Sequence, residues 1–148
     1  MRAGHFGQGV LAAAVAAVVA GCGSSAEPQA AATPRHPSET LAPLFEQPLP
    51  GVAGKTFTSA IVTFPPDARA VPHRHGDAFV YAYVLEGSVR SRLEGGPALV
   101  YQAGQNWSEQ PGAHHVATEN TSTTDPAKLL VVFIAETGQP LKVDDPHG

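Results

Sequence analysis

A series of short apolar runs, separated by glycine and proline, begins near residue 41 and constrains the fold more than any other feature. The runs have the two-residue period that is typical of β-strands, and no stretch after residue 40 carries a convincing helical stripe. Strands are expected at residues 55–64, 79–85, 88–93, 98–102, 106–109, 114–119 and 128–136. Many short strands at roughly ten-residue spacing predict an all-β, single-domain β-barrel of jelly-roll type.

Composition agrees with one turn-rich domain. The 148 residues include 15 glycines and 14 prolines but only 15% charged residues, whereas an average soluble domain has about 25% charged residues. Hydrophobic residues make up 43% of the chain, which is enough for a core. The formal net charge of −4 provides no basic surface for a phosphate backbone, so we expect no nucleic-acid partner.

The first 21 residues have the pattern of a secretory signal. An apolar run from Val10 to Ala20 follows a weakly positive start and is too short to span a bilayer, which needs about 20 residues. The run ends in Val19-Ala20-Gly21-Cys22, which resembles the lipobox of bacterial lipoproteins. The resemblance implies a signal peptide at 1–21, acylation of Cys22, a lipid anchor on the extracytoplasmic side of a membrane, a flexible linker at 22–40 and a domain at 41–148.

Three of the seven histidines have a spacing that suits a metal site. His73 and His75 are two residues apart, and on an extended strand such residues share a face. A proline-glycine turn then leads to His114 and His115, which are adjacent and therefore point to opposite faces of a strand. Only one of this pair can face the interior.

The segments PHRHGDAFVYAYVLEG and GQNWSEQPGAHHVATEN resemble the two motifs of the cupin superfamily. Gly87 fits the closing glycine of the first motif, and Gly104, Gly112 and His115 fit the second. The resemblance implies a cupin barrel with His73, His75 and His115 as metal ligands, while His114 is expected at the rim.

Val80 stands where cupins usually carry a carboxylate ligand, seven residues before Gly87. The resemblance therefore narrows to cupins that bind metal by three histidines, among them dioxygenases. If Val80 lies beside the metal, Val80, Ala82 and Val84 face a small apolar pocket, and Tyr81 and Tyr83 pack outside, where they suit a homodimer interface.

Three neutral imidazoles would leave a divalent ion with its full +2 charge, which favours a small anionic chelating ligand. Imidazole accepts Fe, Zn, Mn, Ni and Cu alike, so the sequence does not select the ion. Asp77 is expected at a loop edge, Glu86 in a hairpin with Gly87, and Glu109 on the polar face of its strand, so none is expected to be a ligand. Trp107 either caps a cavity or fills the core.

Three functions remain open from the sequence. The first is a metal-dependent dioxygenase acting on a small chelating substrate, as the three-histidine resemblance implies. The second is a non-catalytic module that binds a small ligand or a metal. The third is a metal-free isomerase, which would need Tyr81 or Tyr101 to face inward as an acid.

Overall fold

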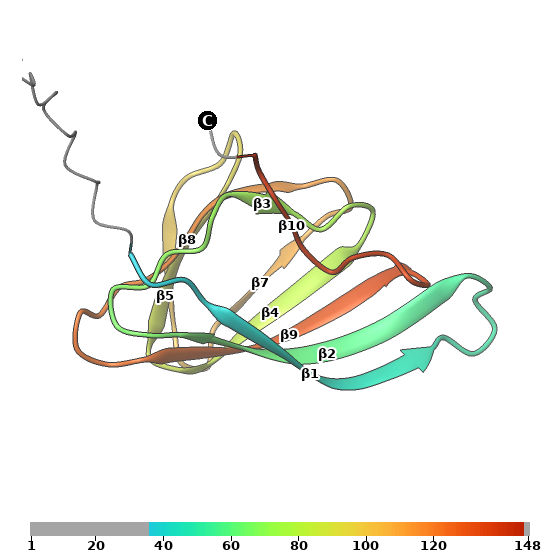
Figure 1. The fold of residues 1–148 in the computed structure, drawn as a ribbon, viewed down its shortest axis with the longest axis horizontal. Coiled ribbons are helices and arrows are strands. Elements are labelled where there is room, and N and C mark those ends of the chain that lie inside the picture. The colour runs from blue at the N-terminus through green and yellow to red at the C-terminus, as the bar shows by residue number, and fades with distance from the viewer. Residues whose placement is uncertain (1–35, 147–148) are drawn as a thin grey trace, which may run out of the picture. The chain divides into compact units, whose positions relative to one another are not determined.

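The computed structural model describes residues 36–146, which form two five-stranded antiparallel sheets (Figure 1). The first sheet has the order β1 (Thr40–Pro48), β2 (Lys55–Phe64), β9 (Ala127–Glu136), β4 (Phe79–Glu86), β7 (Asn106–Glu109). The second has the order β10 (Val143–Asp144), β3 (His73–Arg74), β8 (His114–Asn120), β5 (Ser88–Leu93), β6 (Leu99–Gln102). The all-β, jelly-roll prediction is confirmed. None of the described residues belongs to a helix that could span a bilayer.

The expected signal peptide, the acylated Cys22 and most of the linker lie outside the described residues. The last linker residues fall within them, and β1 begins at Thr40. No strand was expected at β1. Two further strands, β3 and β10, also had no expected counterpart, because they have only two residues each. The seven runs expected from the sequence all form strands, with ends that differ by at most one residue.

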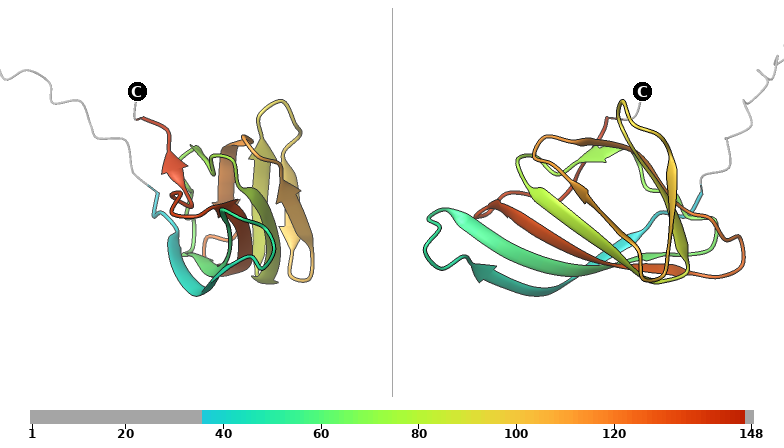
Figure 2. Two further views of the ribbon diagram at one scale, coloured as in Figure 1. Left: turned by 90° about the vertical axis from the view of Figure 1, so that its right-hand side faces the viewer. Right: turned by 180° about the vertical axis from the view of Figure 1, so that it is seen from behind.

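The core lies between the two sheets, which face each other in Figure 2. In β2, β4 and β9 every second side chain is buried, as the two-residue period predicts. The buried members of β4 are Val80, Ala82 and Val84, so the expected inward set is correct. The largest fully buried side chains are Phe64, Phe133, Val80, Val84 and Val89.

Glu86 and Gly87 do not make the expected hairpin. β4 pairs with β7 and β9, whereas β5 pairs with β6 and β8, so Gly87 carries the chain from one sheet to the other. Its φ of 72° is in the left-handed region, and an added Cβ would lie 2.8 Å from the carbonyl oxygen of Pro126. A glycine is required here because the crossing is tight and packed against the chain before β9.

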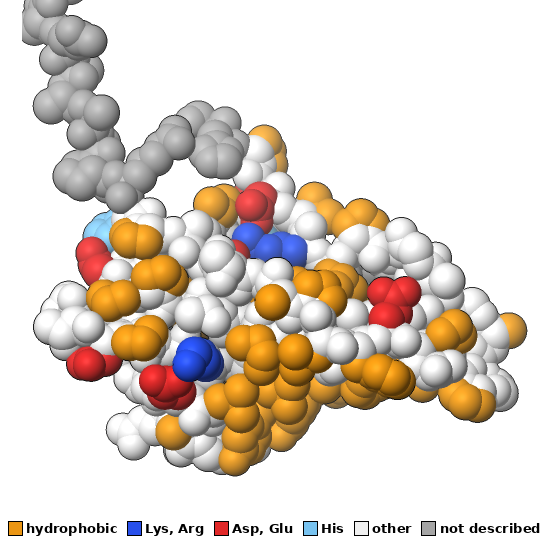
Figure 3. All heavy atoms as spheres, turned by 60° about the horizontal axis from the view of Figure 1, so that its bottom comes forward, with side chains coloured by type: hydrophobic (Ala, Val, Ile, Leu, Met, Phe, Trp, Pro, Cys, Tyr) orange, Lys and Arg blue, Asp and Glu red, His pale blue; other side chains and the backbone are white. Residues whose placement is uncertain are grey.

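The outer face of the first sheet is unusually apolar. The outward side chains of β2, β4 and β9 are half-buried and include Phe57, Ile61, Tyr81, Tyr83 and Val132. Figure 3 views the molecule from below relative to Figure 1 and shows hydrophobic side chains gathered on this side. The homodimer expected from the two outward tyrosines stays a prediction.

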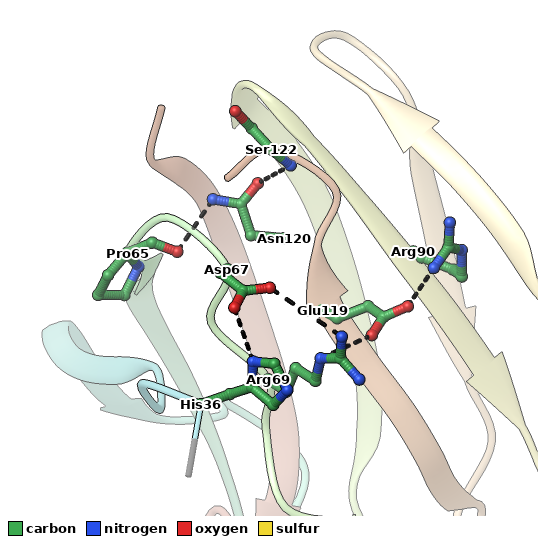
Figure 4. Close-up of polar contacts among 8 residues, drawn as sticks. All are labelled: His36, Pro65, Asp67, Arg69, Arg90, Glu119, Asn120 and Ser122. Atoms are coloured by element: carbon green, nitrogen blue, oxygen red, sulfur yellow. Dashed lines mark hydrogen bonds and ion pairs between the residues drawn. The ribbon is translucent and has the colours of Figure 1, made fainter. Parts of the chain in front are cut away.

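A cluster of ion pairs joins the segment before β1 to the second sheet (Figure 4). His36 contacts Asp67 at 2.8 Å. Arg69 lies 4.0 Å from Asp67 and 3.4 Å from Glu119, which also pairs with Arg90. These groups are mostly exposed, so each pair contributes little by itself, about 0–1 kcal/mol.

Asn120, near the end of the second cupin-like motif, has a structural role. Its side-chain amide donates to the carbonyl oxygens of Pro65 (3.0 Å) and Asp125 (2.7 Å). Its side-chain oxygen accepts from the backbone of Ser122 at 2.9 Å (Figure 4). With both ends of the amide occupied, Asn120 ties two loops together.

Candidate metal centre

His73, His75 and His115 lie together inside the barrel. His73 is directly opposite His115 across the β3–β8 pair, and His75 is two residues further along on the same face. One ring nitrogen of each histidine lies within 4.8 Å of those of the other two. All three residues are buried, with 5%, 8% and 2% of their surfaces exposed. The structure therefore brings together the three histidines that the sequence singled out.

The backbone orients two of the three rings. Nδ1 of His73 donates to the carbonyl oxygen of Val71 at 2.7 Å, and Nδ1 of His75 donates to that of Leu141. A histidine that donates through Nδ1 has its lone pair on Nε2, which is the arrangement found in metal-ligating histidines. Both Nε2 atoms are thus available as ligands.

Burial keeps these two rings neutral near pH 7. Desolvation lowers the pKa of His73 to about 4, against the raising effect of its hydrogen bond to Val71. Desolvation also lowers the pKa of His75, and here the Leu141 carbonyl and Glu109 oppose it. A neutral imidazole is the form that binds a metal ion.

Glu109 is a fourth buried polar residue at this site, and its expected place on the polar face of β7 is wrong. Only 3% of its surface is exposed. Oε1 lies 3.1 Å from Nδ1 of His115 and accepts from the indole N–H of Trp107 at 3.1 Å. Oε2 lies 3.7 Å from Nε2 of His75 and has no hydrogen-bond partner. Position 107 is buried, so the two-residue period alone places 109 inside as well.

The carboxyl group of Glu109 is ionised. Burial, the largest single influence, raises its pKa, but hydrogen bonds and charges from His115, together with His75 and Trp107, outweigh it. The net result is a pKa below the usual range for glutamate. One buried carboxylate therefore accompanies the three histidines, which the sequence analysis did not expect.

The remaining ring, His115, has polar contacts at both nitrogens. Its Nε2 lies 2.8 Å from the hydroxyls of both Ser91 and Thr118, while Nδ1 faces Glu109. A hydroxyl can donate or accept, so Ser91 and Thr118 satisfy Nε2 in either tautomer of His115. Nδ1 can then carry a proton toward Glu109 or present a lone pair to a cation.

The other candidates from the sequence lie outside this cluster. His114 is half-buried at the rim, as its adjacency to His115 predicted. It pairs with Asp145 at 2.7 Å. Asp77 is exposed in a turn, and Glu86 is exposed and pairs with Lys128 at 2.8 Å. Neither acidic residue reaches the histidines.

A small cavity of about 50 Å³ adjoins the histidines. Its lining is mainly apolar and comprises Leu41, Val62, Phe64, Ala70, Val80, Ala82, Trp107, Thr118, Leu129, Val131 and Phe133, besides the histidines and the charged residues Glu39, Glu109 and Lys142. One water needs roughly 10–15 Å³ of such a cavity, so the space suits an ion with a few waters or a very small ligand. Val80 is in this wall, as expected.

Trp107 both fills the core and lines the cavity, the two roles that the sequence left open. It is buried and packs on Tyr101, with ring centroids 4.7 Å apart, and it also lines the cavity. Tyr81 is on the outer face of β4, and neither Tyr81 nor Tyr101 is among the cavity-lining residues. The tyrosine acid that a metal-free isomerase would need is therefore missing from the cavity lining.

The donor set fits a divalent metal ion. Imidazole nitrogen and carboxylate oxygen are ligands for Zn, Fe, Mn, Ni and Cu, and the unpartnered Oε2 of Glu109 marks a polar position that nothing in the protein satisfies. Such a buried atom needs a partner, because leaving a charged acceptor unpaired costs on the order of several kcal/mol. The three-histidine group can thus hold a metal, whose identity the donors do not fix.

Comparison with known proteins supports the fold. The chain is 15% identical to an uncharacterised Klebsiella pneumoniae protein with a double-stranded β-helix domain, with a TM-score of 0.58 over 78% of this chain and 90% of that one. A recombinant oxalate oxidase in complex with glycolate gives a TM-score of 0.56 at 22% identity over 76% of this chain. The DMSP lyase DddQ from Ruegeria pomeroyi gives 0.55 at 22% identity over 62% of it.

The chain spans only 57% of the oxalate oxidase chain and 45% of the lyase chain. No curated protein sequence matches it. Residues 60–133, which run from β2 to β9 and include all three histidines and Glu109, match the cupin domain family. The chain belongs to the cupin domain family.

Proposed function

We propose that the chain binds one divalent metal ion through His73, His75 and His115 and uses it on a small chelating ligand. The observation that carries the proposal is the convergence of three buried, ring-oriented histidines on one side of a cavity. A bound ion would supply Lewis acidity and, if it were iron, one-electron chemistry with dioxygen. The protein's own part is to hold the ion and shape the space beside it.

The cavity walls restrict what can reach the histidines. Val80 and Phe133 are each 1% exposed, and the His75 and Phe133 rings lie 5.3 Å apart. These apolar side chains exclude water from one side of the site, which strengthens electrostatic interactions there. The volume of about 50 Å³ favours a ligand of few atoms.

Lys142 and Glu39 add opposite charges to the cavity lining. Nζ of Lys142 lies 2.7 Å from Glu39 and 2.5 Å from Asp144. Burial alone would lower the pKa of Lys142, but the two carboxylates outweigh it and raise the pKa. Its ammonium group is therefore neutralised by its own partners. The small chelator that we propose has at least one anionic oxygen or sulfur because a divalent ion attracts such atoms.

The reaction class that we propose is metal-dependent dioxygenation of such a chelator. Support comes from the three-histidine set. The oxalate oxidase in complex with glycolate has a similar fold, which supports only that such a barrel can hold a small oxygen-bearing ligand. The alternative is a non-catalytic module that holds a metal or small ligand. It is favoured by the small cavity and by Glu109, which already pairs with His115 and is not a free general base.

Metal content and oxygen uptake distinguish the two. Protein purified without added metal is expected to contain about one divalent ion per chain by mass spectrometry. Oxygen consumption is then measured against small diketones and small thiols, which suit the cavity volume of about 50 Å³. Iron together with uptake on one of these classes supports the dioxygenase. Zinc with no uptake supports the binding module, and the absence of any ion after incubation with iron or zinc contradicts the metal site and with it the dioxygenase.

We also propose that Cys22 is acylated and anchors the domain to a membrane on its extracytoplasmic side. The support is the run Val10 to Ala20 followed by the lipobox-like sequence at Cys22. In a bacterial host, palmitate label is expected on the full chain and in the membrane fraction. Cys22→Ala should lose both the label and the membrane association, whereas retention of either by this variant would contradict the anchor.

A further inference from the structure

We propose that Glu109 is a fourth ligand of the metal ion, supplied from β7 in place of the carboxylate that cupins usually carry on β4. The inference rests on the proposed metal site and adds to it a ligand from outside the two histidine motifs. Glu109 was expected from the sequence on the polar face of its strand.

The register of the sheet puts Glu109 beside the position that lost its carboxylate. Val80 and Glu109 are directly opposite each other in the antiparallel β4–β7 pair, and both are buried. Opposed residues on one face have Cβ atoms about 4.5–5.5 Å apart. A glutamate at 109 therefore reaches the same part of the barrel interior as a glutamate at 80 would reach.

The contact between Glu109 and His75 lacks a positive partner. Nδ1 of His75 donates to the Leu141 carbonyl, so Nε2 presents a lone pair. That nitrogen faces Oε2 of Glu109, also an acceptor, at 3.7 Å, and Oε2 has no hydrogen bond. Two buried acceptors that face each other repel unless a proton or a cation lies between them.

The spacing suits a shared ion. Ligand atoms bound about 2.1 Å from one metal lie about 3–4 Å apart when they are neighbours in the coordination shell. The contacts of Glu109 with His75 and His115 are 3.7 Å and 3.1 Å. The carboxylate thus lies at ligand-to-ligand distance from two of the three histidines.

A carboxylate ligand changes the chemistry expected of the site. Three imidazoles and one carboxylate leave a divalent ion at +1 rather than +2, which weakens its attraction for an anionic ligand. Four protein ligands also leave two positions of an octahedral ion open, enough for a bidentate chelator.

Co²⁺ binding to the whole chain tests the proposal, because visible absorption of bound Co²⁺ reports both affinity and ligand set. Glu109→Gln is expected to weaken Co²⁺ binding by more than 100-fold and to change the absorption spectrum, since loss of a ligand should exceed the 10–100-fold cost of losing a residue that only orients a ligand. Glu119→Gln is the matched control: it removes one negative charge from the exposed ion-pair cluster and should leave affinity and spectrum unchanged.

The second variant moves the carboxylate across the strand pair. Val80→Glu combined with Glu109→Val keeps the two side chains and exchanges their places, and it is expected to recover most of the affinity lost in Glu109→Gln. The inference is overturned if Glu109→Gln keeps the affinity and spectrum of the unmodified chain, or if the exchanged pair binds no better than Glu109→Gln. An unmodified chain that binds no Co²⁺ would instead overturn the metal site itself.

Discussion

Lowering the pH from about 6.5 to about 4 is expected to reduce the free energy of unfolding of the metal-free protein by about 3 kcal/mol through His73 alone. The reason is that burial lowers the pKa of His73 in the folded chain to about 4, while the unfolded chain titrates near 6.5. Below pH 6.5 the unfolded state binds a proton that the folded state does not, so acid favours unfolding. Above pH 6.5 both states are neutral and the effect is absent.

Two neighbours act in the same direction. The pKa of His75 is also lowered by burial, so its protonation likewise favours the unfolded chain as the pH falls. Glu109 has a lowered pKa because the contacts with His115, His75 and Trp107 outweigh its burial, so its stabilising charge is lost at still lower pH. Acid therefore destabilises the site by discharging its carboxylate and by charging its imidazoles.

The measurement is urea unfolding in the presence of a chelator at several pH values between 4 and 7.5. His73→Gln, which cannot titrate, should show a dependence that is flatter by about 3 kcal/mol over this range. The comparison of slopes is unaffected if the variant is less stable overall. Parallel curves for the two proteins would show that His73 is protonated as readily in the folded chain as in the unfolded one.

Much of the fold was predictable because most strands bury one face. β2, β4 and β9 alternate so regularly that their inward sets follow from the sequence. β1 was not predictable in this way: it is an edge strand, exposed along nearly its whole length, and it contains Pro43 beside a break in register. β3 and β10 are too short to have a period at all.

The Gly87 turn shows what local chemistry leaves open. A glycine with positive φ between two strands predicts a tight turn, but it does not say whether the flanking strands pair with each other. Here the partners of β4 are β7 and β9, which begin at Asn106 and Ala127, 20 and 41 residues after β4 ends at Glu86. Strand pairing depends on the whole barrel, so the hairpin expectation failed although the turn was correct.

The part of the candidate site that depends on residue spacing was predictable from the sequence. His73 and His75 share a face because they are two residues apart, and the family resemblance selected His115 over His114. Glu109 was missed because it was placed by its charge and not by the two-residue period of its strand. Trp107, two residues earlier, is buried, and the same alternation places the carboxylate inside. What no local pattern could give is the pairing of Glu109 with Val80.

The adjacent pair His114 and His115 provides the sharpest test of the metal centre. His115→Ala is expected to lower Zn²⁺ affinity by more than 100-fold, since loss of a ligand should exceed the 10–100-fold cost of losing a residue behind one. His114→Ala, one residue away on the same strand, should stay within about 3-fold, because His114 pairs with Asp145 at the rim. Competition with a chromophoric chelator measures both affinities.

His115→Ala also removes the proton donor of Glu109 and leaves Ser91 and Thr118 without their shared partner. A buried Glu109 carboxylate without His115 destabilises the fold by on the order of a few kcal/mol. His115→Gln offers the same neighbours an amide that can hydrogen-bond, so it separates a folding defect from ligand loss. If His115→Gln folds and binds Zn²⁺ as tightly as His114→Ala, His115 is not a ligand. If it folds and has lost the ion, the imidazole itself is what the site requires.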